Sequence, residues 1–428
     1  MADSPADPTL FNDDLPPEDD FLSRAGVAFQ HRDFRWFQAA RLLNMLASEM
    51  LSVAIGWQVY ELTHRPLDLG YVGLAQFLPA FFLILAAGHV ADRYDRRRIL
   101  LVSFTVYGIS AALLLMLTLQ GNRSTAPIFA VLLLIGVVRS FSGPAAQALM
   151  PQIVPAEHFP NAVTWAASTF QAGSILGPAA GGVIYAVGGP VAVLCSSLVM
   201  YAVAWICIWL IHARTGRMEH RDISIETVLA GLRFVWRQKV VLGSISMDLF
   251  AVLLGGAVAL LPIYAKDILN VGSIGFGMMR AAPAIGAVLM AVMLAHRPMK
   301  RRAGVIMLWC VAGFGAATIV FGISRNFWLS LLALFFVGAT DMVSMVVRGT
   351  LVQLYTPPEM RGRVSAVNLL FIGASNEFGQ FESGVTAQWF GTVPAVVLGG
   401  IGSIVVVALW ARWFPEIRKV ETLGENRN

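Results

Sequence analysis

Residues 88–98 read GHVADRYDRRR, and this short basic stretch joins two apolar runs of the chain, 70–87 and 99–120. Each run is long enough to cross a bilayer as a helix, which takes about 20 predominantly apolar residues. Four of the joining residues are arginines, and short loops rich in Lys and Arg remain on the cytoplasmic side of a membrane. One basic turn therefore orients two predicted spans, and the other spans can be counted outward from it.

The composition also places the chain in a membrane. Hydrophobic residues make up 57% of it and charged residues 13%, whereas soluble proteins carry about 25% charged residues. The formal net charge of +5 comes mostly from arginines between the apolar runs, which indicates membrane topology and not a nucleic-acid surface. The three cysteines, Cys195, Cys207 and Cys310, lie inside apolar runs, so neither a disulfide framework nor a metal site is predicted.

Twelve apolar spans are predicted, so the expected fold is an all-α integral membrane protein. Most Lys and Arg residues lie in the even-to-odd links, while the odd-to-even links carry one or fewer, which predicts that both termini are cytoplasmic. The predicted spans are 36–60, 70–91, 99–120, 126–149, 161–187, 190–211, 241–265, 272–296, 304–323, 327–349, 365–388 and 393–413.

The longest link divides the spans into two groups of six. Within this link, apolar residues recur at helical spacing between 225 and 236, which predicts an amphipathic helix lying in the membrane interface. The expected segments are a disordered cytoplasmic tail at 1–33, an N-terminal six-helix bundle at 34–211, a cytoplasmic linker at 212–240, a C-terminal six-helix bundle at 241–413 and a cytoplasmic tail at 414–428.

The two groups of spans form an internal repeat. A shift of 202 positions aligns Pro155 with Pro357, Glu157 with Glu359, Gly177 with Gly379 and Gly182 with Gly384. Two parallel repeats of six spans, with a substrate site between them near the bilayer midplane, are typical of a secondary transporter.

Ionisable residues within the spans are the candidates for that site. A charge at the bilayer centre costs about 2.5–3.5 kcal/mol on insertion scales, so it usually faces a cavity or a partner. Spans one, four, seven and ten are equivalent helices of the repeat, and each carries such a charge, which predicts one shared polar cavity. The predicted cavity residues for proton coupling or substrate binding are Asn44, Glu49, Arg139, Asp248, Asp341, Arg348 and Glu377.

Glu49 and Asp248 are the best candidates for proton binding, because an apolar setting favours the neutral form of a carboxylate. Arg139 keeps its charge, so it can tune a neighbouring carboxylate or attract an anionic substrate. The 202-residue shift places Arg139 opposite Asp341. The alternative hypothesis is a purely structural ion pair that holds the two halves together.

The fifth span contains the glycine-rich stretch GSILGPAAGG at 173–182. Glycines spaced four apart allow close helix contact, and proline bends a helix. Gly173, Gly177, Pro178, Gly181 and Gly182 are therefore candidates for a hinge or gate, with a plain packing interface as the alternative.

Nucleotide and metal motifs are absent from the sequence. There is no G-x-x-x-x-G-K-[ST] phosphate loop, so the chain is not expected to carry its own ATPase. No H-E-x-x-H motif, nucleophile elbow or Cys/His ligand set stands out, which disfavours an enzyme and predicts no cofactor or metal.

From about residue 34 to 415, the sequence resembles the major facilitator superfamily. The turn at 88–97 is similar to that family's loop signature G-x-x-x-D-R-x-G-R-R, with matches at Gly88, Asp92, Arg93, Arg96 and Arg97 and with Asp95 in place of the usual glycine. The resemblance implies that these residues form a cytoplasmic gate that controls the outward-facing state. A turn that only anchors topology is the simpler alternative.

Two further motifs resemble exporters of the superfamily. Arg139-x-x-x-Gly143 is similar to the span-four motif linked to proton coupling, and the 173–182 stretch is similar to the span-five signature of exporters and antiporters, although Thr164 stands where that signature has an earlier glycine. The stretches 155–182 and 357–364 look most like the enterobactin-exporter branch, which includes macrolide-efflux relatives.

The resemblance and the buried charges together predict an exporter of a small siderophore- or drug-like molecule, driven by proton antiport and working by alternating access. We expect a monomer in the bacterial inner membrane whose partners are substrate, protons and lipids, with no nucleic acid. Two alternatives stay open at this point. One is a transporter of the same fold that moves lysophospholipid or other lipid, and the other is a non-transporting scaffold or sensor.

Overall fold

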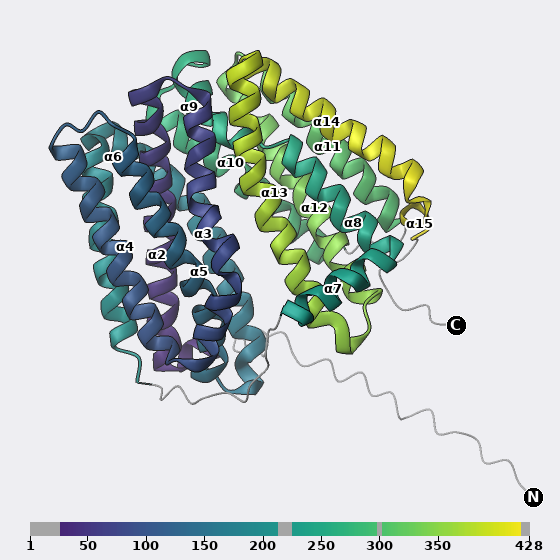
Figure 1. The fold of residues 1–428 in the computed structure, drawn as a ribbon, viewed down its shortest axis with the longest axis horizontal. Coiled ribbons are helices and arrows are strands. Elements are labelled where there is room, and N and C mark those ends of the chain that lie inside the picture. Colours follow the sequence, from purple (N-terminus) through teal and green to yellow (C-terminus); the bar gives the residue numbers. More distant parts are fainter. Residues whose placement is uncertain (1–25, 213–224, 298–301, 421–428) are drawn as a thin grey trace, which may run out of the picture.

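The computed structural model describes residues 26–212, 225–297 and 302–420, and these are helical over almost their whole length (Figure 1). The first group of helices is α2 (Arg32–Thr63), α3 (Pro66–Arg93), α4 (Arg96–Leu119), α5 (Ala126–Ile153) and α6 (Phe159–Trp209). The second group is α8 (Lys239–Leu254), α9 (Leu261–Ile263), α10 (Gly272–His296), α11 (Ala303–Ile323), α12 (Phe327–Leu354), α13 (Arg361–Phe390), α14 (Thr392–Trp413) and α15 (Pro415–Arg418). The linker helix α7 (Ile225–Arg237) lies between them in sequence, and the short turns are η2 (Val27–Gln30), η3 (Ala156–His158), η4 (Ala257–Leu260), η5 (Tyr264–Ile268) and η6 (Pro358–Met360).

Among the described residues, ten helical segments are long and apolar enough to cross a membrane. Two of the twelve predicted spans, 161–187 and 190–211, lie in α6, which consists of two helices joined at a kink at Gly189 (φ 63°, ψ −165°), just before Pro190, and which counts once among the ten. The predicted span 365–388 lies in α13, which is not among the ten. Polar residues such as Glu377 and Gln380 lower the hydropathy of α13. The helix can carry them because these side chains face other parts of the protein and not lipid.

The predicted span 241–265 is broken in the structure. Helix α8 ends at Leu254, and the chain continues through Gly255 and Gly256 into the short turns η4, α9 and η5. A side chain does not fit at Gly256, because a Cβ there would lie 2.7 Å from the carbonyl oxygen of Gly379 on α13. The two glycines therefore end the helix where another backbone approaches closely.

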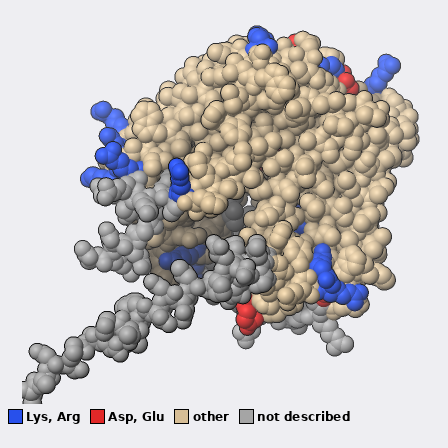
Figure 2. Space-filling model, turned by 180° about the vertical axis from the view of Figure 1, so that it is seen from behind, with Lys and Arg blue, Asp and Glu red and all other residues tan. Residues whose placement is uncertain are grey.

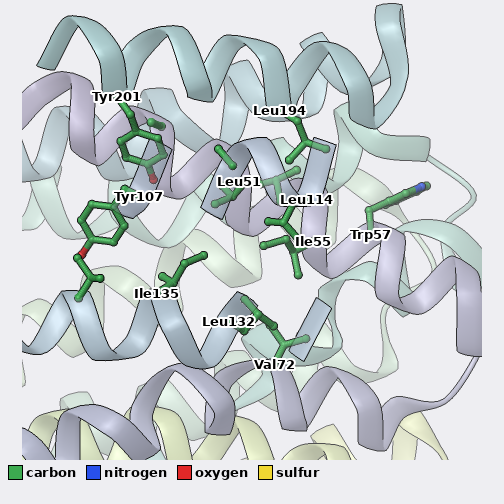
Figure 3. Close-up of a cluster of buried hydrophobic side chains, with 14 of the residues drawn as sticks. Leu51, Ile55, Trp57, Val72, Tyr107, Leu114, Leu132, Ile135, Leu194 and Tyr201 are labelled. Atoms are coloured by element: carbon green, nitrogen blue, oxygen red, sulfur yellow. The ribbon is translucent and has the colours of Figure 1, made fainter. Parts of the chain in front are cut away.

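The two groups stand side by side, and the helices within each group pack mainly on one another, as α2 does on α6 and α11 on α14 (Figure 1). Figure 3 shows the core of the first group, where Leu51, Leu114, Leu132 and Tyr201 are buried. Because lipid tails are as apolar as these side chains, close van der Waals packing holds such a core together.

The two ends of the molecule differ in how the groups meet. The end of the molecule at which α2 stops is called the His64 end. The opposite end, at which α4 begins, is called the Arg96 end. At the His64 end the backbones of the two groups touch: an added Cβ at Gly384 of α13 would lie 3.0 Å from the Cα of Gly70 on α3. In Figure 1 the groups lean together at the top, near α9, and diverge towards the bottom, near α7.

The surface in Figure 2 carries few charges, and its lower part is hollowed. Lys or Arg atoms are visible inside this hollow, while most of the remaining surface is uncharged. Exposed Leu, Val, Phe and Trp side chains are numerous on these helices, for example Phe82 at 71% and Trp309 at 74%. Such surface suits contact with lipid.

The linker helix α7 occupies the predicted amphipathic segment. Val235 is 1% exposed and packs in a cluster with Val364 and Val367 of α13, whereas Leu229 and Trp236 are exposed. One face of α7 is thus packed against the second group, while its apolar residues Leu229 and Trp236 lie outside the protein core.

Candidate functional site

An ion pair crosses between the two groups near the middle of their facing helices. The Arg139 Nη1 atom of α5 lies 3.7 Å from Oε1 of Glu377 on α13. The Gln380 Nε2 atom donates to the other carboxylate oxygen at 3.2 Å. The Arg139 side chain is 61% exposed and that of Glu377 is 15% exposed. The arginine therefore reaches from open space towards a mostly enclosed carboxylate.

Space for this carboxylate is provided by Gly73 of α3. A Cβ at that position would lie 3.0 Å from Oε2 of Glu377 and 2.9 Å from Oε1 of Gln380. A larger residue would therefore displace both side chains. Gly73, in the second predicted span, thus leaves room for the carboxylate of Glu377, in the eleventh.

A second ion pair crosses between the groups, from α2 to α10. The Arg280 Nε atom lies 3.5 Å from Oε2 of Glu49, and its Nη2 donates to Oγ of Ser52 at 2.8 Å. The exposed fractions of the Glu49 and Arg280 side chains are 25% and 24%. Both groups are accessible to small solutes and yet largely withdrawn from bulk water.

We treat the two pairs together as one ion-pair unit, because both join the same two groups of helices near the middle of the molecule. The unit contains two carboxylates and two guanidinium groups on four helices, so its net charge is zero when all four are ionised. The sequence predicted a shared polar cavity from spans one, four, seven and ten. The structure builds this unit from spans one, four, eight and eleven.

Two other predicted cavity residues meet elsewhere. Asp248 of α8 and Arg348 of α12 form an ion pair inside the second group, where they are 6% and 3% exposed. Asp341 of α12 is half-buried, and no described residue forms an ion pair or hydrogen bond with its side chain. It is not the partner of Arg139, which is paired with Glu377.

The glycine-rich stretch of α6 packs on α2 around Glu49. Gly173 lies against Met45, Gly181 against Met50, and a Cβ at Gly177 would lie 2.5 Å from the Cβ of Glu49. Further along the same face, Gly182 lies against Ser273 of α10. This face therefore positions Glu49.

The backbone angles stay helical along this stretch. The described angles of α6 depart from helical values at Gly189 and not at Gly177 or Pro178. The chain keeps helical backbone angles past the proline in this conformation. The hinge therefore stays a prediction, while the close packing is observed.

Replacing Gly177 by Ala is expected to lower the free energy of unfolding by about 1–3 kcal/mol, because the added methyl overpacks the contact with Glu49. The melting temperature of the purified protein would measure this. Gly349→Ala on α12 is the matched control, since nothing lies within 4 Å of its Cβ position and alanine favours a helix. Equal melting of both variants would contradict the role of Gly177.

At the His64 end, polar side chains of η5 bind α2. The Tyr60 hydroxyl donates to Oδ2 of Asp267, and Nζ of Lys266 lies 3.2 Å from Oε1 of Glu61. Lys266 and Asp267 are consecutive residues of η5, a π-helical turn, and both contact α2. We call these four residues the latch.

Two aromatic residues of the first group hold Glu61 of the latch in place. The Trp57 Nε1–H donates to Oε1 of Glu61 at 2.9 Å, and the Tyr185 hydroxyl donates to Oε2 at 3.3 Å. The Lys266 ammonium also lies 5.9 Å from the centre of the Trp57 ring. These contacts fix the carboxylate for the lysine of the other group.

At the Arg96 end, the basic turn contacts its own group. The Arg97 Nε atom donates to the carbonyl oxygen of Ile208 at 3.2 Å, and its Nη2 donates to that of Trp209, so it caps the end of α6. Arg96 is buried at 2% exposure, Arg93 is exposed and Gly88 is half-buried. The side chain of Asp92 lies outside the described residues.

The turn also explains the departure from the family signature. Asp95 is the N-cap of α4, where its Oδ1 accepts from the Arg97 backbone N–H at 2.9 Å, and its φ is −61°. A glycine is therefore not required for the backbone, and aspartate is among the preferred N-cap residues.

The model of the transmembrane secretion effector family matches residues 25–426. The enterobactin exporter EntS of Citrobacter koseri is 24% identical over 391 residues, which cover 91% of this chain and 93% of that protein. The EntS of Escherichia coli O1:K1 is also 24% identical, over 389 residues, again with 91% and 93% covered.

Solved transporters share the fold. A bacterial homolog of the human lysosomal transporter Spinster, in an inward-facing and unoccupied conformation, has a TM-score of 0.70 at 13% identity, covering 91% of this chain and 98% of that one. The nucleoside transporter NupG has a TM-score of 0.67 at 14% identity, with 89% and 99% covered. The family match over nearly the whole chain confirms the resemblance: this protein belongs to the transmembrane secretion effector family of the major facilitator superfamily and is a multi-pass protein of the inner membrane.

Proposed function

We propose that this protein exports a small molecule by proton antiport and alternating access between two six-helix halves, 34–211 and 241–413. Twelve membrane crossings with both termini in the cytoplasm complete the proposal. The observation that carries it is the pair of mid-molecule ion pairs, Arg139–Glu377 and Glu49–Arg280, because each has its acid on one half and its base on the other.

Each of these carboxylates can either bind a proton or form the ion pair with its arginine, but not both at once. When Glu377 takes a proton, it loses the charge that attracts Arg139, and a contact between the halves weakens. When the proton leaves, the pair forms again and draws α5 and α13 together. An acid withdrawn from water but still accessible is suited to such exchange near neutral pH.

The conformation described above fits one stage of this cycle. The halves touch at the His64 end and diverge towards the Arg96 end, which is cytoplasmic in the proposed topology. In this stage Glu377 is paired and has given up its proton, so the site is ready for a cytoplasmic substrate. Opening at the His64 end would expose Glu377 to external protons, which enter as the substrate leaves.

The relatives guide the choice of substrate. Two proteins that cover nine-tenths of the chain are named enterobactin exporters, and we propose a siderophore- or drug-like cargo for this chain. The absence of a phosphate-loop motif in the sequence leaves the ion gradient as the energy source.

The test uses inverted vesicles that contain the protein and are energised to be acid inside, with a pH-sensitive dye. Adding siderophores, macrolides or lipophilic cations should cause substrate-dependent proton release. Glu377→Gln is expected to reduce the signal at least about tenfold, because amides do not carry the exchanged proton.

Glu382→Gln is the matched control on the same helix, since Glu382 accepts from the Thr386 hydroxyl at 2.6 Å within α13. It should retain the signal. Silence across the panel with folded protein, together with lysophospholipid movement in the absence of a pH gradient, would refute the proposal in favour of lipid handling.

A further inference from the structure

A separate cavity of about 140 Å³ lies inside the first group, between α2, α4, α5 and α6. It shares no lining residue with the two mid-molecule ion pairs. Aromatic rings of Phe37, Phe104 and Phe170 form part of its wall. An apolar cavity of about 150 Å³ holds a benzene ring, so this one has room for a single ring or a compact acidic group.

Arg41 of α2 gives this cavity a positive charge. Its side chain is half-buried, and in the described parts of the chain no residue forms an ion pair or hydrogen bond with its guanidinium, which contacts the Phe37 ring at 5.7 Å. By contrast, Arg139, Arg280 and Arg348 each have a carboxylate partner. A cation inside a membrane protein normally has a counter-charge.

Two further polar groups line the wall, an acceptor on Asn44 and a hydroxyl on Thr169, and of these only the hydroxyl can donate to an anion. The Oδ1 atom of Asn44 is buried and has no hydrogen bond. The Thr169 hydroxyl accepts from Nε2 of Gln38 at 3.0 Å, which leaves its own proton free to be donated. Asn44, the predicted cavity residue with no role so far, thus belongs to this cavity and not to the ion-pair unit.

The cavity lies nearer the Arg96 end than the two ion pairs do. Arg41 precedes Glu49 by eight residues on α2, which is about 12 Å along the helix towards the Arg96 end. Arg41 therefore lies on the cytoplasmic side of Glu49 in the proposed topology.

We propose that this cavity, the Arg41 pocket, binds the acidic end of an organic anion, such as a carboxylate or phosphate on an apolar body. The guanidinium pairs with the anion, the Thr169 hydroxyl donates to it, and the aromatic wall covers the adjoining apolar part. The anion belongs either to the exported molecule, in which case the inference rests on the proposed function, or to a lipid headgroup.

Equilibrium dialysis of radiolabelled benzoate with the purified full-length protein tests the pocket. Arg41→Gln is expected to weaken benzoate binding at least about tenfold, with partial retention in Arg41→Lys. Benzamide, which has the same shape without the charge, should not compete. Arg35→Gln is the matched control, because Arg35 is exposed on the same helix. Equal benzoate affinity in the wild type and Arg41→Gln, or equal competition by benzamide, would overturn the proposal.

Competition with lysophosphatidic acid distinguishes the two sources of the anion. Displacement of benzoate by lysophosphatidic acid, and not by monoacylglycerol, assigns the pocket to a lipid headgroup. Retention of benzoate assigns it to a soluble anion. Loss of benzoate binding with intact proton release would refute the pocket alone, whereas benzoate binding without any proton release would refute antiport alone. Arg41→Lys keeps the experiment decisive if Arg41→Gln does not fold.

Discussion

Asp248→Asn is expected to destabilise the folded protein by about 3–5 kcal/mol, because it leaves the Arg348 guanidinium buried without a counter-charge. The two side chains are 6% and 3% exposed, so water cannot replace the lost carboxylate. In the purified protein this appears as a large fall in melting temperature and a loss of the monodisperse fraction. Asp68→Asn, at the partly exposed first turn of α3, should change little.

A double variant separates the contribution of the ion pair to stability from the cost of leaving one buried charge without its partner. Asp248→Leu combined with Arg348→Met removes both charges and should recover most of the stability, since replacing a buried pair by apolar residues is often neutral. If instead Asp248→Asn folds normally and abolishes proton release, Asp248 carries the proton, as the sequence interpretation suggested, and the pair is functional.

The sequence predicted which helices hold charges but not which charges meet. Hydropathy reveals that Glu49, Arg139 and Glu377 lie inside spans, whereas the direction in which each points depends on the rotation of its helix. The 202-residue shift relates equivalent positions of the halves, so it suggested Asp341 for Arg139. The observed partner, Glu377, lies on a helix with no equivalent relation to α5, and only packing of α3, α5 and α13 brings the two together.

Residues near the ends of spans gave still less signal. Glu61 and Lys266 lie where charged side chains ordinarily reach the membrane surface, and Arg41 lies within reach of the opposite surface, so snorkelling explains all three equally well. The glycine face of α6 is different, because glycines spaced by four predict close packing directly. That prediction placed the contact correctly, although it could not name Glu49 as the neighbour.

Lys266→Glu is expected to raise opening at the His64 end about a hundredfold. The substitution replaces the ion pair with Glu61 by a repulsion, and the new carboxylate also lies next to Asp267. Like charges placed together cost several kcal/mol. A cost of about 2.7 kcal/mol is enough to change an equilibrium constant a hundredfold. A two-state equilibrium shifts by the difference in stability of its states, so the closed end loses population.

The reporter for this opening is a cysteine at Ser273, which is 8% exposed beside Gly182 at the α6–α10 contact. Cys195, Cys207 and Cys310 are first replaced by alanine, and a membrane-impermeant maleimide is added outside intact cells. Labelling should be slow in this background and about a hundredfold faster after Lys266→Glu.

Two variants decide whether the latch causes the change. Lys239→Glu reverses a charge in the pair with Glu416, 3.4 Å apart within the second group, and should leave labelling slow. Glu61→Lys combined with Lys266→Glu restores an ion pair of opposite polarity and should slow labelling partly, because the hydrogen bonds from Trp57 and Tyr185 to Glu61 are lost. Equal labelling rates in the Lys239→Glu and Lys266→Glu variants would show that helix packing, and not the latch, holds this end closed.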